Sequence, residues 1–246
     1  MTVALITGAG AGIGRAIALR LARDGYDIAV VDRADEAGEG TCALIRETGV
    51  KAAFFEADVS SDAQVARFVE RAEEVLGPIA AFVNNAGIEG AVAPIDDYPE
   101  EAFDRVFAVN VKGAFLCLKR VLARMRKRGT GAVVNIASTS SIRGRAGLAG
   151  YVASKHALLG QTRAAALDMA GTAVRVNAVL PGPVETRMIE EIDRKAREAG
   201  RDIRRSGAAS YAKPEQIADV VAFLLSEQAS HVNGAAWTVD AASTVA

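Results

Sequence analysis

The chain has 246 residues, 50% of them hydrophobic, which is enough to bury a substantial core, and we expect one large α/β domain over residues 1–246. Its 29 Lys and Arg residues balance 30 Asp and Glu residues, and no basic block is present that could follow the phosphates of a nucleic acid. No apolar run reaches transmembrane length and no signal sequence is visible, so we expect a soluble, cytoplasmic protein that binds neither nucleic acid nor membrane.

The two cysteines give no sign of a disulfide or of a metal site. Cys42 and Cys117 lack metal-ligand spacing, and both fall inside predicted helices. We therefore expect buried, reduced thiols.

The first predicted element is a strand over Val3 to Thr7 that runs into a glycine-rich turn, Gly8 to Gly14, after which apolar residues recur at helical spacing. Glycines let a backbone approach a pyrophosphate at a helix N-terminus. A second strand, Asp27 to Val31, ends in Asp32, whose carboxylate could hold a ribose diol. On this pattern alone, a tight strand-to-helix turn that binds no ligand stays open.

Strands and helices continue to alternate along the chain. We expect further strands near 51–56, 79–83, 132–137, 174–179 and 235–239, and helices near 34–48, 62–76, 100–127, 150–170 and 214–226. Such alternation implies a parallel sheet covered by helices on both faces. Ser61 to Gln64 fits a capping box. Ligands of such sheets lie beyond the carboxyl ends of the strands, so Asp32, Asp58, Asn84 and Ser138 are expected on one rim.

Ser138, Tyr151 and Lys155 form the candidate catalytic group. Tyr151 and Lys155 are four residues apart on a predicted helix and share one face, where the ammonium can favour the phenolate. A cation about 4 Å away at an effective dielectric near 20 supplies about 4 kcal/mol, enough to lower the tyrosine pKa from about 10 to about 7. Ser138 could donate to a carbonyl oxygen while Tyr151 transfers the proton. Taken alone, a Tyr–Lys pair at this spacing is more often an ordinary helix feature.

Two further regions carry weaker signals. Asn110 lies in an apolar stretch of the long predicted helix, where it is either a packing compromise or the mark of a distortion around a water. The segment from 185 to about 212 is the most charged in the chain. It is most simply a solvated helical face, but it follows the sixth strand on the same rim, where a substrate-covering lid would lie.

Together these motifs resemble those of the short-chain dehydrogenase/reductase family over nearly the whole chain. Thr7 to Gly14 matches its Thr-Gly-x-x-x-Gly-Ile-Gly motif, Asn84 to Gly87 its Asn-Asn-Ala-Gly motif, and Tyr151 to Lys155 its Tyr-x-x-x-Lys signature. Pro181-Gly182 followed by Thr186 matches its nicotinamide loop. The resemblance implies a single Rossmann-type domain with a doubly wound, seven-stranded parallel sheet in the order 3-2-1-4-5-6-7. It also implies a homotetramer or a dimer, although Ala241 and Ala242 replace the glycines usual after the last strand.

The resemblance also implies roles for single residues. Tyr151 would be the general acid/base, Lys155 would hold the nicotinamide ribose, Ser138 would orient the substrate oxygen, and Asn110 would hold a proton-relay water. No metal is needed, because the phenol handles the alcohol proton. The residues implied in dinucleotide binding are Gly8, Gly12, Ile13, Gly14, Asp32, Arg33, Asp58, Val59, Asn85, Ala86, Gly87, Tyr151, Lys155, Pro181, Gly182, Val184 and Thr186.

Charge favours NAD over NADP as the cofactor. Asp32 can accept hydrogen bonds from a ribose 2′-hydroxyl but repels a 2′-phosphate, and Ala11 stands where phosphate-binding members often have a basic residue. Arg33 argues the other way, because a guanidinium directly after the acid could meet a phosphate.

The substrate we expect is a secondary alcohol or ketone of modest size with polar substituents, because Glu89 and Arg143 stand in otherwise small, apolar loops. Ser140 and Met188 are the other candidates for the substrate pocket. Two alternatives stay open. One is an NADPH-dependent reductase of 3-oxoacyl thioesters, which Asp32 and Ala11 disfavour. The other is a non-catalytic dinucleotide-sensing protein, which need not retain the four catalytic residues together.

Overall fold

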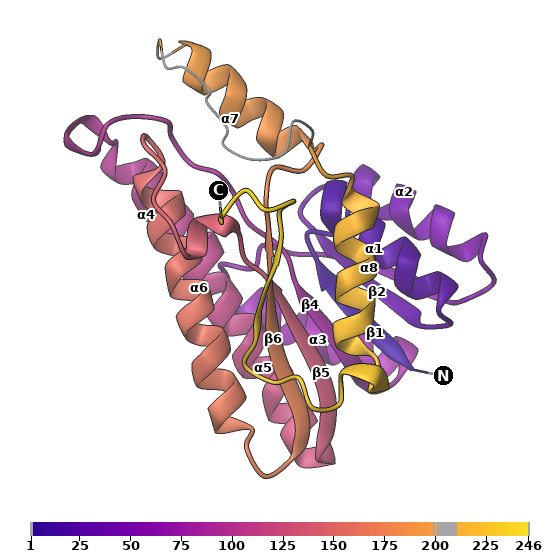
Figure 1. Ribbon diagram of the computed structural model, residues 1–246. Coiled ribbons are helices and arrows are strands. Elements are labelled where there is room, and N and C mark those ends of the chain that lie inside the picture. Colours follow the sequence, from indigo (N-terminus) through magenta and orange to yellow (C-terminus); the bar gives the residue numbers. More distant parts are fainter. Residues whose placement is uncertain (1, 199, 201–210, 246) are drawn as a thin grey trace.

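The computed structural model describes residues 2–198, 200 and 211–245, and these contain one seven-stranded sheet (Figure 1). Its order is β3-β2-β1-β4-β5-β6-β7, which confirms the order implied by the family resemblance. All neighbouring strands pair in parallel, so their carboxyl ends meet at one edge. The strands are β1 (Val3–Thr7), β2 (Asp27–Asp32), β3 (Ala52–Glu56), β4 (Ile79–Asn84), β5 (Thr130–Ile136), β6 (Ala173–Pro181) and β7 (Ala236–Val239).

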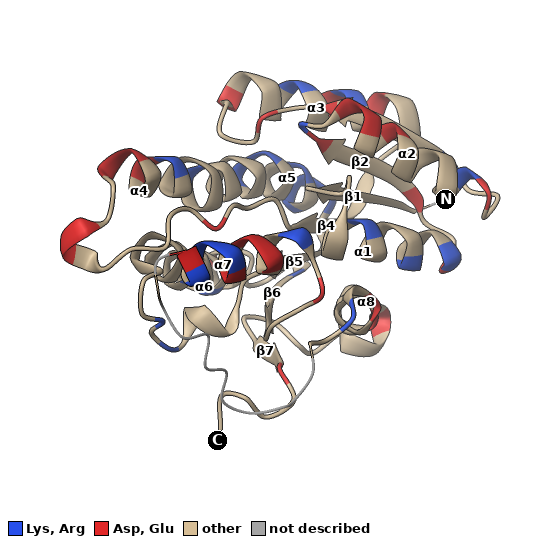
Figure 2. Cartoon of the chain, turned by 90° about the horizontal axis from the view of Figure 1, so that it is seen from above, with Lys and Arg blue, Asp and Glu red and all other residues tan. Residues whose placement is uncertain are grey.

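Helices cover both faces of the sheet, as Figure 2 shows from above. Side chains of one strand alternate between the two cores: Ala4 and Ile6 pack with the first group of helices, and Val3 and Leu5 with the second. Burial on both faces is why the central strands read as continuous apolar runs. The first group is α1 (Gly12–Arg23), α2 (Asp35–Arg46) and α8 (Pro214–Leu225), and the second is α3 (Asp62–Leu76), α5 (Ala114–Arg128) and α6 (Ala149–Asp168).

The helix expected near 100–127 is interrupted at Asn110. It consists of α4 (Glu100–Phe107), a π-helical turn η2 (Ala108–Gly113) and α5. The Asn110 side chain reaches out of this turn and binds both backbone polar groups of Ile88: Oδ1 accepts from Ile88 N at 2.8 Å, and Nδ2 donates to Ile88 O at 2.9 Å. The distortion that the sequence left as one of two interpretations is therefore present, and a distant loop anchors it.

The capping box predicted at Ser61 is wrong. Ser61 is the N-cap residue of α3 but makes no side-chain capping bond. Gln64 turns instead to the preceding loop, where its Oε1 accepts from Asp58 N at 2.8 Å. The loop after β3 is thereby fixed to the start of α3. The remaining short helices are η1 (Ile95–Asp97), η3 (Thr139–Ser141) and η4 (Glu227–Ala229).

Helix α7 (Arg187–Glu198) lies beyond the carboxyl edge of the sheet, at the top of Figure 1. The two ends of the segment that contains it are joined: Glu185 N donates to Ala212 O, and Ala212 N to Pro183 O, both at 2.9 Å. Of the charged segment expected at 185–212, residues 199 and 201–210 lie outside the described residues.

The turn after β7 carries two alanines in the left-handed region, Ala241 at φ 47° and Ala242 at φ 66°. This conformation favours glycine, which accounts for the glycines usual at this point in the family. The Asp240 carboxylate holds the turn here, because its Oδ2 accepts from Ser243 Oγ at 3.1 Å and from Thr244 Oγ1 at 2.7 Å.

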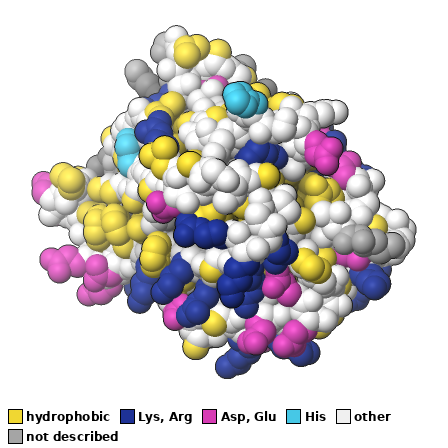
Figure 3. Space-filling view, turned by 90° about the horizontal axis from the view of Figure 1, so that it is seen from below, with side chains coloured by type: hydrophobic (Ala, Val, Ile, Leu, Met, Phe, Trp, Pro, Cys, Tyr) yellow, Lys and Arg dark blue, Asp and Glu magenta, His cyan; other side chains and the backbone are white. Residues whose placement is uncertain are grey.

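The face opposite the carboxyl edge gathers many Lys and Arg side chains (Figure 3). The last turn of α5 supplies Arg126, Lys127 and Arg128, where cations interact favourably with the helix dipole. Arg128 pairs with Glu73 at 2.8 Å. Within the described ranges, none of the helices combines the length and apolarity needed to cross a bilayer, and no His, Cys, Asp and Glu side chains cluster as metal ligands. Cys42 and Cys117 are buried free thiols, as expected.

Candidate active site

A cleft with two cavities lies at the carboxyl edge of the sheet. The larger, of about 350 Å³, is lined by the glycine turn, the ends of β2 and β3 and the loop after β4. The smaller, of about 100 Å³, is lined by Ser138, Tyr151, Lys155 and the loop after β6. All 17 residues implied in dinucleotide binding line one cavity or both. The cavities share Ile13, Asn85, Gly87, Thr186 and Met188.

The glycine turn has the geometry that an anion site requires. Gly8 and Gly12 have φ of +65° and +53°, and a Cβ on Gly14 would lie 2.1 Å from the Gly8 carbonyl oxygen. Ala11 is the N-cap of α1, so no side chain caps the first amides of this helix, and its first turn has no acidic residue. The uncapped amides and the positive end of the helix dipole therefore suit the diphosphate of a dinucleotide.

Asp32 is held at the end of β2 by three backbone amides. Its Oδ2 accepts from Gly10 N at 2.8 Å, and its Oδ1 accepts from Arg33 N at 2.7 Å and from Ala34 N at 3.1 Å. The carboxylate is thus fixed on the wall of the larger cavity. Asp58 lines the same cavity, and although burial opposes its ionisation, hydrogen bonds from Ser60 and the Arg33 charge together lower the pKa of Asp58.

Tyr151, in the first turn of α6, and Ser138, at the N-cap of η3, meet in the smaller cavity. Ser138 Oγ accepts from Ser140 N at 3.1 Å and lies close enough to Tyr151 to affect the pKa of the phenol. Burial raises the pKa of Tyr151 above its ordinary value, Glu89 raises it further, and Ser138 and the Arg145 charge only partly oppose this. Tyr151 is therefore a neutral phenol at pH 7.

Lys155 does not act on Tyr151 as expected. Its Nζ lies 5.6 Å from the centre of the Tyr151 ring and donates to the Ile136 carbonyl at 2.9 Å. Burial lowers the pKa of Lys155 to about 8. The expectation that the ammonium alone brings the tyrosine pKa to about 7 is wrong for this structure, because it neglected the cost of burying both charges.

The loop after β4 is hydrogen-bonded to the glycine turn and to the π-helical turn η2. The Asn85 side chain donates to Thr7 O at 2.9 Å and Gly8 O at 3.0 Å, which fixes the loop to the glycine turn. Asn110 holds Ile88 and donates to Ser154 Oγ at 3.1 Å. These contacts use both N–H groups of the Asn110 amide and one of the two lone pairs of its Oδ1. Asn84, expected on the rim, is buried and donates to Ala114 O and Asn135 Oδ1, both at 3.1 Å.

The four expected substrate residues divide into two pairs. Ser140 and Met188 line the smaller cavity, and the buried Ser140 hydroxyl has no hydrogen-bond partner among the described residues. Glu89 and Arg143 do not line it. Arg143 instead donates to the Ser243 carbonyl in the C-terminal turn, and the cavity wall is formed by Arg145, two residues further on.

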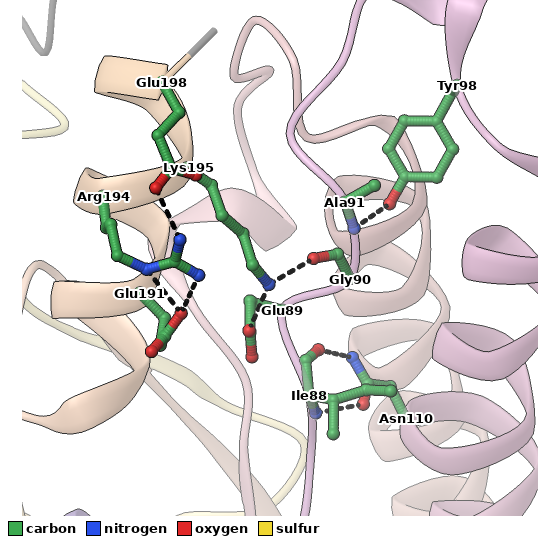
Figure 4. Close-up of polar contacts among 10 residues, drawn as sticks. All are labelled: Ile88, Glu89, Gly90, Ala91, Tyr98, Asn110, Glu191, Arg194, Lys195 and Glu198. Atoms are coloured by element: carbon green, nitrogen blue, oxygen red, sulfur yellow. Dashed lines mark hydrogen bonds and ion pairs between the residues drawn. The ribbon is translucent and has the colours of Figure 1, made fainter.

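Glu89 belongs to a contact between α7 and the loop after β4, drawn in Figure 4. Lys195 Nζ lies 2.7 Å from Glu89 Oε1 and 3.0 Å from the Gly90 carbonyl oxygen. Arg194, the residue before Lys195 in α7, pairs instead with Glu191 and Glu198 of its own helix. On the same helix Met188, Ile189 and Ile192 line the smaller cavity, so α7 covers it with apolar side chains and is tied down by Lys195.

Comparison with known proteins decides the family, because a family model described as short chain dehydrogenase matches residues 2–197. The chain belongs to this family. Levodione reductase of Leifsonia aquatica is 41% identical, with 99% of this chain and 94% of the relative covered. A cyclohexanol dehydrogenase from an Acinetobacter species is 38% identical, with 98% and 94% covered. The crystal structure of levodione reductase matches with a TM-score of 0.93 at 40% identity, covering 100% and 98% of the two chains. That of NAD+-bound xylitol dehydrogenase matches with a TM-score of 0.90 at 36% identity, covering 98% of each.

As a short-chain dehydrogenase, the chain is an oxidoreductase that acts on alcohols or ketones. Sequence reasoning missed Arg145, Ile192 and Lys195. The Ile192 spacing to Met188 is a helical signal that could have been found. No pattern distinguishes Arg145 from Arg143 in a loop, because loop residues lack the periodicity that reveals a face.

Proposed function

We propose that the chain transfers a hydride between NAD(H) and a secondary alcohol or ketone, with Tyr151 as the general acid/base. The observation that carries this proposal is the meeting of Ser138, Tyr151 and Lys155 in a cavity that shares five lining residues with the larger one, where the glycine turn and Asp32 lie. In the oxidation direction an alcohol and NAD+ give a ketone, NADH and a proton. The bound nicotinamide supplies the hydride acceptor or donor.

The residues divide the remaining work. The Ser138 hydroxyl donates to the substrate oxygen, and Tyr151 gives that oxygen a proton during ketone reduction or takes one during alcohol oxidation. The raised pKa of Tyr151 supports its role as the proton donor at neutral pH. Lys155 holds the nicotinamide ribose, and the backbone at Asn110 holds a water that passes protons to solvent. The unpartnered Ser140 hydroxyl is a further donor to the substrate.

NAD is the proposed cofactor because Asp32 carries a fixed carboxylate on the wall of the larger cavity. A ribose diol can donate to that carboxylate, whereas a 2′-phosphate would be repelled. NAD is also the nucleotide named for the xylitol dehydrogenase relative.

In this proposal the chain is a single domain, and residues 185–212 cover the substrate. The apolar face of α7 over the smaller cavity and the joined ends of the segment support it. The homotetramer or dimer and the cytoplasmic location stay predictions from the sequence.

The test is turnover measured at the reduced-nicotinamide band with NAD and, separately, NADP, across polyols, sugars, hydroxy acids, cyclic alcohols and a 3-oxoacyl thioester. We expect activity with NAD on secondary alcohols, loss of turnover in Tyr151→Phe, and NAD binding retained in that variant. Activity with NADPH on the thioester alone would favour the alternative reductase. NAD binding without turnover of any substrate would favour the sensing protein. Activity retained in Tyr151→Phe would remove Tyr151 from its role.

A further inference from the structure

The loop between Ser138 and Tyr151 is not held in place by burial. It runs from the end of η3 to the start of α6 over residues 142–148, here called the cavity loop, and two of its residues line the smaller cavity. None of residues 142–147 is buried, and a Cβ on Gly144 would meet no atom within 4 Å. A segment with so few packing contacts depends on hydrogen bonds for its position.

Both ends of the cavity loop are bonded to other segments. At the end next to α6, Ala93 N donates to Gly147 O at 3.0 Å, and Ala93 and Leu148 form a parallel bridge. At the end next to η3, the Arg143 guanidinium donates to the Ser243 carbonyl, 100 residues further along the chain. Its Nε is buried without a hydrogen-bond partner among the described residues, so the bond to Ser243 is the contact that a substitution removes. Arg143 lines neither cavity, and this bond therefore acts on the loop rather than on a ligand.

The C-terminal turn, residues 240–244, offers a fixed point for that bond. Ser243 is buried, and its N donates to Asp240 O at 3.0 Å, in addition to the side-chain bonds that the Asp240 carboxylate accepts. The turn also packs on the loop after β6, because Gly182 N donates to Val239 O at 3.0 Å and a Cβ on Gly182 would lie 3.1 Å from Asp240 Cα. Since Gly182 lines the smaller cavity, the turn contacts two segments of the cavity wall.

The backbone of the C-terminal turn is held in an unfavourable conformation. Ala241 and Ala242 both have a positive φ, which alanine adopts only where the surrounding contacts hold it. Strain of this kind is found mostly at functional sites. In this conformation the Ser243 carbonyl meets Arg143, so the strained turn serves the wall of the cavity.

We propose that the C-terminal turn positions the cavity loop, and that Arg143 is the positioning residue that joins the two. This rests on the proposed oxidoreductase function. Ser138 and Tyr151 lie on either side of the segment that the bond fixes, so the bond keeps their hydroxyls at the spacing that proton transfer to a substrate oxygen needs.

Arg143→Met removes the donor and keeps most of the aliphatic stem. We expect kcat for a secondary alcohol to fall about 10-fold, and KM and the dissociation constant of NAD to change less than about twofold, because a loosened loop aligns the two hydroxyls less often. Arg143→Lys restores one donor and should recover most of kcat. Arg126→Met is the matched control and should leave kcat unchanged, because Arg126 also donates to a backbone carbonyl, that of Asp168 at 3.0 Å, but lies outside both cavities.

A chain that ends at Ala242 tests the acceptor of the bond. Because it lacks Ser243, its kcat should fall by about the same factor as that of Arg143→Met, and the two changes together should lower kcat no further. Losses of kcat that multiply would show that Arg143 does not act through the turn, and would overturn the proposal.

Hydrogen exchange separates this inference from the proposed function. Ile142 N donates to Thr139 O at 3.2 Å, and in Arg143→Met this amide should exchange about 10-fold faster, while the amides of β5 keep their wild-type rates. Faster exchange in a protein that turns over no substrate would contradict the proposed function alone and support the positioning role. Wild-type exchange at Ile142 in Arg143→Met would overturn that role, as would an unchanged kcat in an active enzyme.

Discussion

The buried charge of Lys155, which the proposed catalysis requires, lowers the free energy of unfolding. The lysine is buried, and burial lowers its pKa from 10.5 to about 8. The difference corresponds to about 3 kcal/mol of folding free energy, which the protein forgoes by keeping the group charged at pH 7. A neutral side chain would leave the Ile136 carbonyl without the hydrogen bond that Lys155 donates, so the variant recovers only part of this free energy.

We therefore expect Lys155→Met to abolish turnover and to raise the free energy of unfolding at pH 7 by about 2 kcal/mol. Between pH 8 and 10.5 the unfolded lysine binds more protons than the folded one, so wild-type stability gains with rising pH and the advantage of the variant shrinks. Urea unfolding at pH 7 and pH 10 checks both points, with exposed Lys119→Met as control. A variant less stable at pH 7, or an advantage independent of pH, would contradict this account.

The sequence could predict which motif residues line the cleft, but it could not predict the direction of their pKa shifts. The motifs placed Ser138 and Tyr151 in one cavity, as the structure has them. The direction of the Tyr151 pKa shift was predicted wrongly, because desolvation depends on tertiary packing that spacing along one helix does not contain. The sequence favoured Arg143, whereas the cavity is lined by Arg145, because loop residues lack the periodicity that would show which of the two faces the cavity.

At the scale of elements, α7 lies at the surface over the smaller cavity. None of its residues is buried, although three apolar side chains line the cavity beneath it. The ion pair from Lys195 to Glu89 is partly exposed and joins α7 to the loop whose Ile88 is bound by Asn110. An opening of α7 must break this pair, so its strength contributes to the closed population.

Lys195→Met should therefore raise the substrate KM about fivefold or less, with a smaller effect on kcat, because a partly exposed pair is worth about 1 kcal/mol at most. Added salt should bring the wild-type KM towards that of the variant, since salt screens the pair. Arg194→Met is the matched control, because its pairs stay within α7. Equal effects of the two substitutions on KM would remove the contact with Glu89 from substrate binding.

The boundaries of helices and strands could be predicted where they depend on the periodicity of neighbouring residues. The predictions failed where a side chain binds a segment that is distant in the sequence. The strands and most helices follow from runs of apolar residues, and the observed bounds differ from the expected ones by a few residues. The break at η2 depends on Ile88, 22 residues away along the chain, and Gln64 serves the loop at Asp58 rather than Ser61. A side chain that leaves its own helix for another segment gives no signal in a window of neighbouring residues.

At the scale of the whole molecule, the parallel sheet gathers the ends of β1, β2, β4, β5 and β6 on one edge, and this is why residues from Gly8 to Thr186 meet in one cleft. The alternation of strands and helices was sufficient to predict that convergence. The sequence alone did not decide whether this helix covers the cleft, because a charged amphipathic helix is equally typical of a solvated surface.

Binding across that cleft should be measurable as stability of the entire fold. At 100 times its dissociation constant, NAD should raise the free energy of unfolding by about 2.7 kcal/mol, or the melting temperature by about 5–10 °C, and NADP at the same concentration should raise the melting temperature less.

Asp32→Ala should narrow the difference between the melting-temperature shifts that NAD and NADP cause. It also removes the acceptor of three backbone amides, so the shift caused by each nucleotide, rather than the melting temperature itself, is the quantity to compare. Asp35→Ala removes an equal charge at an exposed position outside the cleft and should leave the difference intact. A larger shift with NADP in the wild type would assign the ribose site to Arg33 instead.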